Sequence, residues 1–200
     1  MAKQNTYPKR FKFNKVQDKW TKFWKDEGIH SFDINAEGEM FSIDTPPPFV
    51  SGTLHLGHIL NHSWIDFVAR YNKMRGKNVY FPQGYDCHGL PVELAVEKNY
   101  GISKDDRDKF LKKCKEWVDD NIQSMKKQFD ALGYSTDWDY TYRTMNDDYK
   151  YKVQKSLLDY FEKGWLYREK FPTHFCVNCE TSVAKAEVGY REKEGKLWYI

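Results

Sequence analysis

Two histidines three residues apart, His55 and His58, flank Gly57 in a stretch that reads Pro-Phe-Val-Ser-Gly-Thr-Leu-His-Leu-Gly-His from residue 48 to 58. Imidazole N–H groups can donate to phosphate oxygens as negative charge grows during attack on an α-phosphate. A glycine between them lets a flat base approach the backbone closely. These residue types predict a nucleotide triphosphate site in which neither histidine has to act as a base or a nucleophile.

The surrounding sequence predicts that the histidines lie where a strand turns into a helix. Residues 40–44 form a short β-prone run, and the prolines in 45–48 cannot continue a central strand because they supply no ladder N–H. Gly52 allows the chain to bend before apolar periodicity begins near His55. A helix that begins there presents free N–H groups and the positive end of its dipole to an anion.

One further carboxylate and one pair of cysteines could take part in chemistry. Asp86 follows a predicted strand, at the carboxyl edge of the sheet where parallel α/β folds bind ligands. Alternatively, it is a turn aspartate that hydrogen-bonds its own backbone. Cys176 and Cys179 have the spacing of a metal knuckle, but zinc needs four ligands and the sequence offers no second pair. The pair is therefore half of a zinc site, or two thiols in a turn.

In order along the chain, these motifs resemble the signatures of the class I aminoacyl-tRNA synthetases, most closely those of the group specific for valine, isoleucine and leucine. The proline turn and histidine pair at 45–58 resemble the first signature of the family. The block at 81–91, Phe-Pro-Gln-Gly-Tyr-Asp-Cys-His-Gly-Leu-Pro, resembles the one after the group's second strand. Trp20 and Trp24 resemble its N-terminal helix, and the cysteine pair with Ala-Glu-Val at 186–188 resembles its zinc-binding segment.

The resemblance implies a set of site residues. It places ATP at His55, Gly57, His58 and Asn61, and it gives both histidines the catalytic role of stabilising charge at the transferred phosphate. The implied cofactors are ATP, Mg²⁺ and Zn²⁺. Zinc would be held by Cys176 and Cys179 and completed by a second cysteine pair that comes later in the family.

The resemblance also implies an amino-acid site made of Pro47, Pro48 and Asp86. The carboxylate pairs with the substrate's α-ammonium group, and the prolines form a wall for a small branched side chain. The substrate's carboxylate attacks the α-phosphorus of ATP, pyrophosphate leaves with magnesium, and the aminoacyl group passes from the adenylate to tRNA.

The identity of the amino acid depends on two details. Thr-Pro-Pro-Pro at 45–48 favours valine, whereas Asp-Cys-His-Gly at 86–89 departs from the Asp-His-Ala-Gly usual in bacterial valine-specific enzymes and resembles isoleucine-specific ones. Archaeal-type valine-specific enzymes carry this combination. Valine is therefore the expected substrate, isoleucine is the alternative, and leucine comes third.

The resemblance predicts that the chain is incomplete. The lysine-containing second signature of the family, of the Lys-Met-Ser-Lys-Ser type, does not occur between residues 1 and 200. We therefore expect the N-terminal part of a longer synthetase, weak or inactive alone, whose partner is the remainder of that polypeptide. Residues 196–200 read as an amphipathic strand, consistent with a stalk toward an editing insertion.

Periodicity predicts an α/β fold, with helices at 14–27, 55–75, 103–132 and 147–163, strands at 40–44 and 78–81, an extended segment at 165–171 and a ribbon after 173. Cys114 falls on an apolar helical stripe and is expected to be a buried thiol. The expected architecture is a Rossmann-like parallel sheet, the first half of a class I synthetase catalytic domain, with a small zinc-ribbon-like appendage. The domain prediction is a helical arm at 1–38, the half-domain at 39–170, and the ribbon with its stalk at 171–200.

Composition limits the partners. Hydrophobic residues make up 40% of the 200 residues and aromatic residues 17%, enough for a core. A net charge of +3 excludes a polybasic nucleic-acid binder, so contact with RNA must be local. No run approaches the ~18 apolar residues of a membrane span, and the basic N-terminus lacks the apolar segment of a signal peptide. A cytoplasmic protein is expected.

Three other functions fit single motifs. A nucleotidyltransferase acting on a metabolite would use the same His-x-Gly-His turn without dependence on tRNA. A metal-dependent hydrolase would use His55, His58 and His88 as ligands. A non-catalytic module would bind tRNA or a protein partner without affinity for ATP.

Overall fold

The computed structural model describes residues 10–50, 52–102, 104–185, 188–192, 194–196 and 198. The chain divides into two compact units, Met1–Val153 and Gln154–Ile200. Ser51, Ser103, Ala186 and Glu187, which enter the sequence predictions, lie outside the described residues. So do positions 197, 199 and 200 of the expected stalk.

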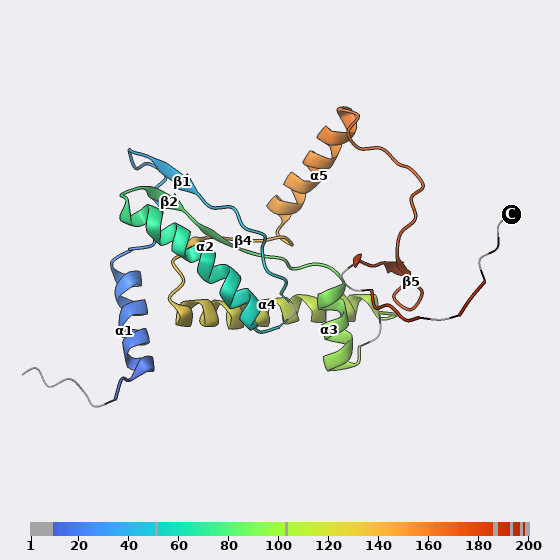
Figure 1. Ribbon diagram of the computed structural model, residues 1–200, viewed down its shortest axis with the longest axis horizontal. Helices are drawn as coiled ribbons and strands as arrows, with labels where there is room; N and C mark the ends of the chain where they lie inside the picture. Colours follow the sequence, from blue (N-terminus) through green and yellow to red (C-terminus); the bar gives the residue numbers. More distant parts are fainter. Residues whose placement is uncertain are drawn as a thin grey trace, which may run out of the picture. The chain divides into compact units, whose positions relative to one another are not determined.

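A βαβ unit holds the histidine signature. Strand β1 (Met40–Ser42) pairs in parallel with β2 (Asn78–Tyr80), and α2 (Leu56–Met74) makes the crossover between them (Figure 1). Parallel strands need such a crossover, and the 19 residues of α2 are long enough for one. The predicted strands and helix are confirmed within two residues at each end.

A second parallel pair was not foreseen. Strand β3 (Pro82–Tyr85) follows β2 after one residue and pairs with β4 (Asp137–Arg143). The alternation of Trp138, Tyr140 and Tyr142 along β4 is a β-strand signal that sequence reasoning missed. Because β3 is short and contains Gly84, its pattern alone does not reveal a strand.

Four other helices occur along the chain, before, between and after these strands: α1 (Phe13–Asp26), α3 (Leu90–Tyr100), α4 (Arg107–Leu132) and α5 (Asp147–Glu162). Helix α3 was not predicted, although Pro91 in its first turn and the left-handed Gly101 at its end are helix signals. Helix α4 begins four residues later than expected, because the side chain of Asp106 accepts the N–H of Lys109 and caps it.

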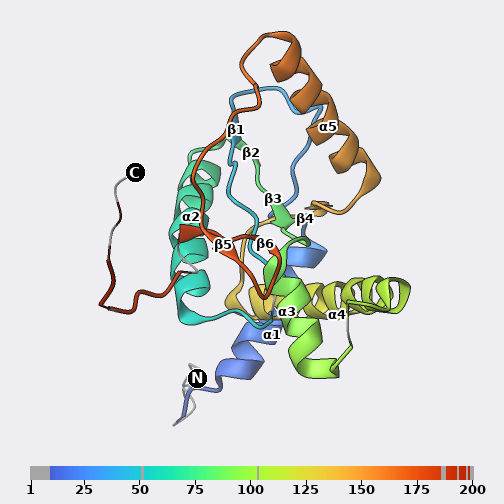
Figure 2. The ribbon, with the colours of Figure 1, turned by 90° about the vertical axis from the view of Figure 1, so that its right-hand side faces the viewer.

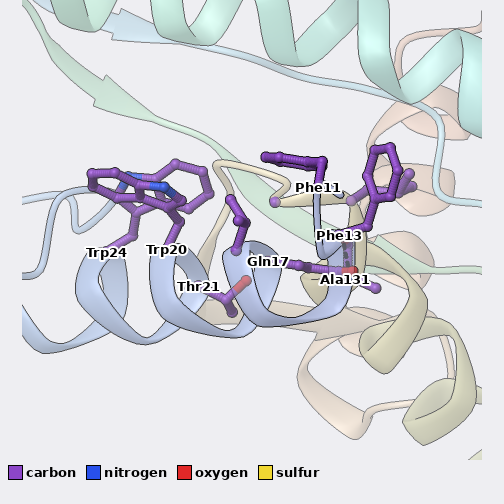
Figure 3. Close-up of a pocket in the computed structure, with 10 residues that line it drawn as sticks. Phe11, Phe13, Gln17, Trp20, Thr21, Trp24 and Ala131 are labelled. Atoms are coloured by element: carbon purple, nitrogen blue, oxygen red, sulfur yellow. Dashed lines mark hydrogen bonds between the residues drawn. The ribbon is translucent and has the colours of Figure 1, made fainter. Parts of the chain in front are cut away.

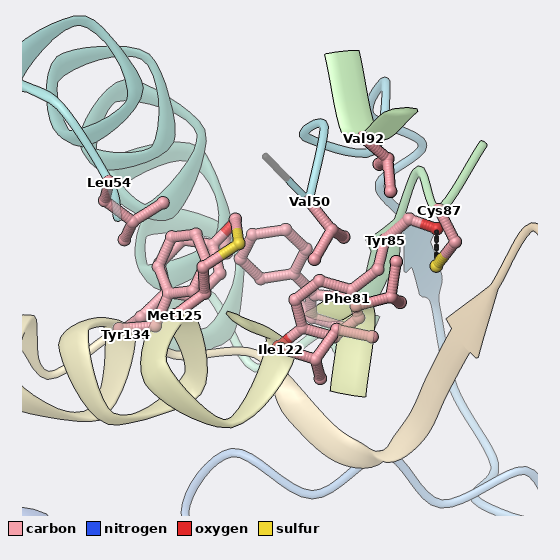
Figure 4. Packing of buried hydrophobic residues seen from close by; sticks show 13 residues of the cluster. Val50, Leu54, Phe81, Tyr85, Cys87, Val92, Ile122, Met125 and Tyr134 are labelled. Atoms are coloured by element: carbon pink, nitrogen blue, oxygen red, sulfur yellow. Dashed lines mark hydrogen bonds between the residues drawn. The ribbon is translucent and has the colours of Figure 1, made fainter. Parts of the chain in front are cut away.

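The core of the first unit joins α4 to the strands. Figure 4 shows side chains of α4 and of the β3 region converging in one cluster, with Val50 and Leu54 from the turn before α2. Phe81, Tyr85, Met125 and Phe129 are each at most 1% exposed. Burying side chains of this size stabilises the fold by about 1.5–3 kcal/mol each. Cys114 is only half-buried at the edge of this cluster.

Helix α1 joins the first unit through its aromatic side. Trp24 lies against Gly133 at the end of α4, and the Arg70 guanidinium lies 5.1 Å from the Trp24 ring centroid. Gln17 donates to the carbonyl of Ala131. A cavity of about 320 Å³ remains between the aromatic residues of α1 and the end of α4, and Figure 3 shows the residues that line it.

The second unit contains a small hairpin. Strands β5 (Phe175–Cys176) and β6 (Thr181–Ser182) pair antiparallel (Figure 2). Cys176 ends β5, and Cys179 lies in the turn between the strands. The segment 165–171, expected to be extended, forms no strand, and neither do the described residues of 196–200.

Candidate active site

His55 is the N-cap of α2 rather than a member of the helix. Its backbone is extended, with φ −98° and ψ 169°, and its Nδ1 accepts the N–H of His58 at 3.3 Å. The ring thus satisfies one of the free N–H groups that a helix N-terminus leaves open. The remaining open N–H groups of this first turn, and the dipole behind them, stay available to an anion.

The two imidazoles of the signature lie face to face. The ring centroids of His55 and His58 are 3.7 Å apart, and the ring planes are inclined by 19°. Burial and the neighbouring His55 ring both lower the pKa of His58 from its ordinary value of 6.5. His58 is therefore predominantly neutral near pH 7 and offers a hydrogen-bond donor without a full charge.

Gly57 makes room for this arrangement. A Cβ added at position 57 would lie 3.0 Å from Cε1 and 3.1 Å from Nδ1 of His55. A larger residue would make the capping ring shift by a few tenths of an ångström, so glycine leaves this ring undisturbed.

Helix α2 is held in place by a buried ionic contact at its middle. Asp66 accepts the N–H of Ser135 at 2.7 Å and pairs with Arg70 at 2.7 Å. Arg70 also donates to the carbonyl of Gly133. Asp66 as a residue is only 8% exposed. Its charge-assisted contacts therefore fix the helix against the segment after α4.

The proline turn and Asp86 meet at the end of the strands. The N–H of Asp86 donates to the carbonyl of Pro48, and the N–H of Val50 donates to the carbonyl of Asp86, both at 2.9 Å. Phe49 and Asp86 form an isolated parallel bridge. Pro48 is buried and Pro47 is half-buried beside this bridge. His55 follows Val50 by five positions, so the segment that is bridged to Asp86 leads along the chain to the histidine pair.

The Asp86 carboxylate is oriented by two donors. Its Oδ1 accepts the N–H of His88 at 3.4 Å and the hydroxyl of Thr144 at 3.3 Å. The first contact is the local turn that sequence reasoning offered as the alternative. The second comes from the residue after β4, a long-range contact that no local pattern announces.

A buried histidine one turn further along α2 was also missed. His62 lies below His58, and its Nδ1 is 2.9 Å from the hydroxyl of Tyr134. Burial, with a smaller effect of His58, lowers the pKa of His62 from 6.5 to about 4. His62 is therefore a neutral part of the core beneath the signature. Asn61, its neighbour, is exposed on α2.

The two cysteines of the second unit are joined by a local hydrogen bond. The N–H of Cys179 donates to Sγ of Cys176 at 3.4 Å, and the next residue, Glu180, has φ 54°. Hydrogen bonds from the backbone and side chain of Cys179 lower the pKa of the Cys176 thiol. Two thiols so arranged can supply half of a tetrahedral site.

Within the described residues, no three His, Cys, Asp or Glu side chains are grouped so as to hold a metal ion. His55, His58 and His88 therefore do not form the three-histidine site of the hydrolase alternative. Separately, none of the helices in the described part of the chain has the length and apolarity to cross a membrane.

Comparisons with known proteins agree with the motifs. Residues 19–200 match the family model described as tRNA synthetases class I (I, L, M and V). The chain is 56% identical over 193 residues to the valine–tRNA ligase of Pyrococcus furiosus, which covers 96% of this chain and 22% of that protein. It is 47% identical over 194 residues to the valine–tRNA ligase of Archaeoglobus fulgidus, with 96% and 22% covered.

A solved structure gives the same fold. The agnB2 LeuRS of Agrobacterium radiobacter K84, in a ternary complex with tRNA and LeuAMS, matches with a TM-score of 0.73 and 29% identity over 88% of this chain and 21% of that one. The chain spans about a fifth of the length of these relatives. The expected family is confirmed: this chain belongs to the class I tRNA synthetases of the I, L, M and V group.

Proposed function

We propose that the chain is the N-terminal catalytic part of a valine–tRNA ligase, which joins valine to tRNA through a valyl-adenylate. The observation that carries the proposal is the bridge between 48–50 and Asp86, directly upstream of the imidazole pair. The bridge joins Asp86, an anionic group suited to an ammonium ion, to the segment that leads along the chain to the N-terminus of α2, which is suited to phosphate. The 56% identity to a valine–tRNA ligase supports valine over isoleucine.

In this proposal the triphosphate, with its magnesium, lies at the start of α2. The neutral His58 and the capping His55 donate to oxygens of the α-phosphate as charge grows during in-line attack. Gly57 leaves the helix start bare beneath the adenosine, and the exposed Asn61 extends the polar side of the nucleotide site.

The amino acid binds at the neighbouring end of the strands. Asp86 pairs with the α-ammonium group, and this contact turns the substrate's carboxylate toward the α-phosphorus. Pro47 and Pro48 form a rigid wall for the branched side chain, because their ring torsions are fixed. Positioning and charge stabilisation together account for the reaction without a protein base.

Cys176 and Cys179 would hold a zinc ion as two of its four ligands. Zinc would supply a structural link between this hairpin and ligands elsewhere in the longer polypeptide. The prediction of a helical arm at 1–38, a half-domain at 39–170 and a ribbon at 171–200 belongs to the same proposal, as does a cytoplasmic location.

The test is amino-acid-dependent exchange between ATP and pyrophosphate in the full-length synthetase that carries these residues. We compare valine, isoleucine, leucine and threonine at saturating ATP. The expected result is the highest kcat/KM with valine, followed by transfer of valine to tRNA. Stronger exchange with isoleucine would overturn the choice of substrate. Exchange with none of the four would favour a nucleotidyltransferase that acts on another metabolite.

A matched measurement uses residues 1–200 alone. We expect this chain to give weak or no exchange, because the second lysine signature of the family is not among its residues. Robust aminoacylation by the 200-residue chain would contradict that expectation.

A further inference from the structure

We propose that Thr144 is a positioning residue for the Asp86 carboxylate and so sets the affinity of the site for the ammonium group of its substrate. This inference rests on the proposed function, because it assumes that Asp86 is the ammonium partner. Thr144 lies immediately beyond the end of β4, 58 residues from Asp86 in sequence.

The hydroxyl of Thr144 has its direction set by the backbone. The N–H of Cys87 donates to Oγ1 of Thr144 at 2.9 Å, which occupies a lone pair of that oxygen. The hydroxyl proton is therefore left to donate, and Oδ1 of Asp86 lies 3.3 Å away. A single side chain thus connects the N–H of residue 87 to the carboxylate of residue 86.

The position of Thr144 itself is fixed by the sheet. Its N–H donates to the carbonyl of Tyr85, the last residue of β3, at 3.1 Å, so the β3–β4 pairing continues one residue past the end of β4. Tyr85 and Cys87 on the facing segment are 1% and 3% exposed and belong to the core drawn in Figure 4. The donor that orients the carboxylate is therefore attached to rigid backbone rather than to a loop.

The two hydrogen bonds to the Asp86 carboxylate reach the same one of its oxygens. Both donors, the hydroxyl of Thr144 and the N–H of His88, reach Oδ1. Among the residues that the structure describes, none donates a hydrogen bond to Oδ2. Oδ2 can then make a short charge-assisted hydrogen bond to an ammonium group while Oδ1 stays anchored. A carboxylate held in this way loses little rotamer freedom when the substrate binds.

The experiment compares Thr144→Val with Thr144→Ser by amino-acid-dependent exchange in the full-length synthetase. Valine at 144 keeps the shape but removes the hydroxyl, whereas serine keeps the hydroxyl. We expect Thr144→Val to raise KM for valine by about 10- to 100-fold, the usual effect of a hydrogen bond to a charged group. We expect KM for ATP to change less than about threefold, and Thr144→Ser to stay within about threefold of the unsubstituted enzyme for both substrates.

Thr136→Val is the matched control. Thr136 is a buried threonine next to β4, and its hydroxyl donates to the carbonyl of Phe81 at 2.7 Å without contact to Asp86. Thr136→Val removes a hydroxyl next to the same strand, and we expect it to leave KM for valine unchanged.

A second readout uses isovalerate, which has the branched chain and carboxylate of valine without the ammonium group. The inhibition constant of isovalerate should not change in Thr144→Val. A generally damaged pocket would weaken the binding of isovalerate as well as that of valine.

The outcomes separate the inference from the proposed function. If the unsubstituted enzyme shows no valine-dependent exchange, the proposed function fails. If it exchanges and Thr144→Val has an unchanged KM for valine, or weakens isovalerate equally, the positioning role is overturned. Should Thr144→Val not fold, as judged by circular dichroism, Thr144→Ala and Thr144→Ser form the comparison. Equal KM values for valine in that pair would likewise overturn it.

Discussion

His55 caps the helix with the same ring that stacks on His58, so one imidazole both completes the first turn and determines the environment of the other. The two roles are linked through a single N–H···N contact of 3.3 Å. A substitution of either histidine is therefore expected to change the position or the environment of the other ring.

The first prediction concerns the histidine pair. His58→Ala should lower kcat for valine-dependent exchange by about 100-fold, because one donor to the developing phosphate charge is lost. KM for valine should change little, since His58 does not contact Asp86 in the structure. The exposed His174 provides the control, and His174→Ala should stay within about twofold. Equal loss in both variants would contradict the assignment.

The second prediction concerns Gly57. The added methyl group of Gly57→Ala would stand 3.0 Å from the His55 ring, so the ring must shift by a few tenths of an ångström and its capping contact is weakened. We expect KM for ATP to rise by about tenfold with the fold intact, as measured by exchange and circular dichroism. Gly189→Ala is the control, because an added Cβ there meets nothing within 4 Å. Unchanged KM for ATP in Gly57→Ala would show that the cap is dispensable.

The third prediction concerns the close approach of Gly84 and Tyr142. A Cβ at position 84 would lie 2.3 Å from Cζ of Tyr142, whose ring also stacks on Tyr149 at 5.8 Å. Gly84→Ala should reduce the free energy of unfolding by about 1–3 kcal/mol, because the ring must move and the β3–β4 pairing is strained. Urea denaturation measures this loss. Combining Gly84→Ala with Tyr142→Ala should cost less than the sum of the two single changes; strict additivity would contradict the contact.

The fourth prediction concerns pH. His62 is 3% exposed, and its pKa in the folded chain is lowered to about 4 from 6.5. Between these values the unfolded chain binds a proton that the folded chain does not, so stability is full above pH 6.5 and falls as the pH drops toward 4. The expected loss from this residue is about 3 kcal/mol across the window.

The comparison for this prediction is His62→Asn against His174→Asn, measured by urea denaturation at pH 7 and pH 5. The first variant should show a smaller decrease in stability between the two pH values than the unsubstituted chain. The second should show the full decrease, since His174 is exposed. Burial also lowers the pKa of His30 to about 4. His30 therefore contributes to the loss of stability at low pH in every variant. Identical pH dependence in His62→Asn would disprove the assignment.

The fifth prediction concerns zinc. The full-length protein should contain one zinc ion per chain that Cys176→Ser removes, as measured by mass spectrometry of the metal. Cys114→Ser should retain the ion, because Cys114 lies at the edge of the core rather than in the hairpin. Full zinc content after loss of Cys176 would rule out the knuckle as a ligand pair.

Sequence reasoning reached the parts of the fold whose signals are local. The βαβ unit followed from a β-prone run, a proline turn and a 3.6-residue period, all within 45 residues. The ends of α4 and α5 followed from Gly133 and Gly164, which have φ of 71° and 72°. The membership of the family followed from short signatures in a fixed order and is confirmed.

Local signals did not predict the elements whose formation depends on packing against residues distant in sequence. Helix α3 has weak amphipathic character, and Val92 and Val96 become a core face only because α4 packs on them. Strand β3 contains a glycine that looks like a strand breaker until Tyr142 is seen to fill the space of a side chain.

By itself, the sequence determined where the signatures of the family lie, because His55, Gly57, His58 and Asp86 stand in short motifs that can be read in order. Only the tertiary structure decided how those residues are held. It turned His55 into a cap, placed His62 and Tyr134 beneath the signature, and brought Thr144 to Asp86 from 58 residues away. The reason is that residue type and spacing are local properties of a chain, whereas orientation is set by hydrogen bonds and packing between segments that meet only on folding.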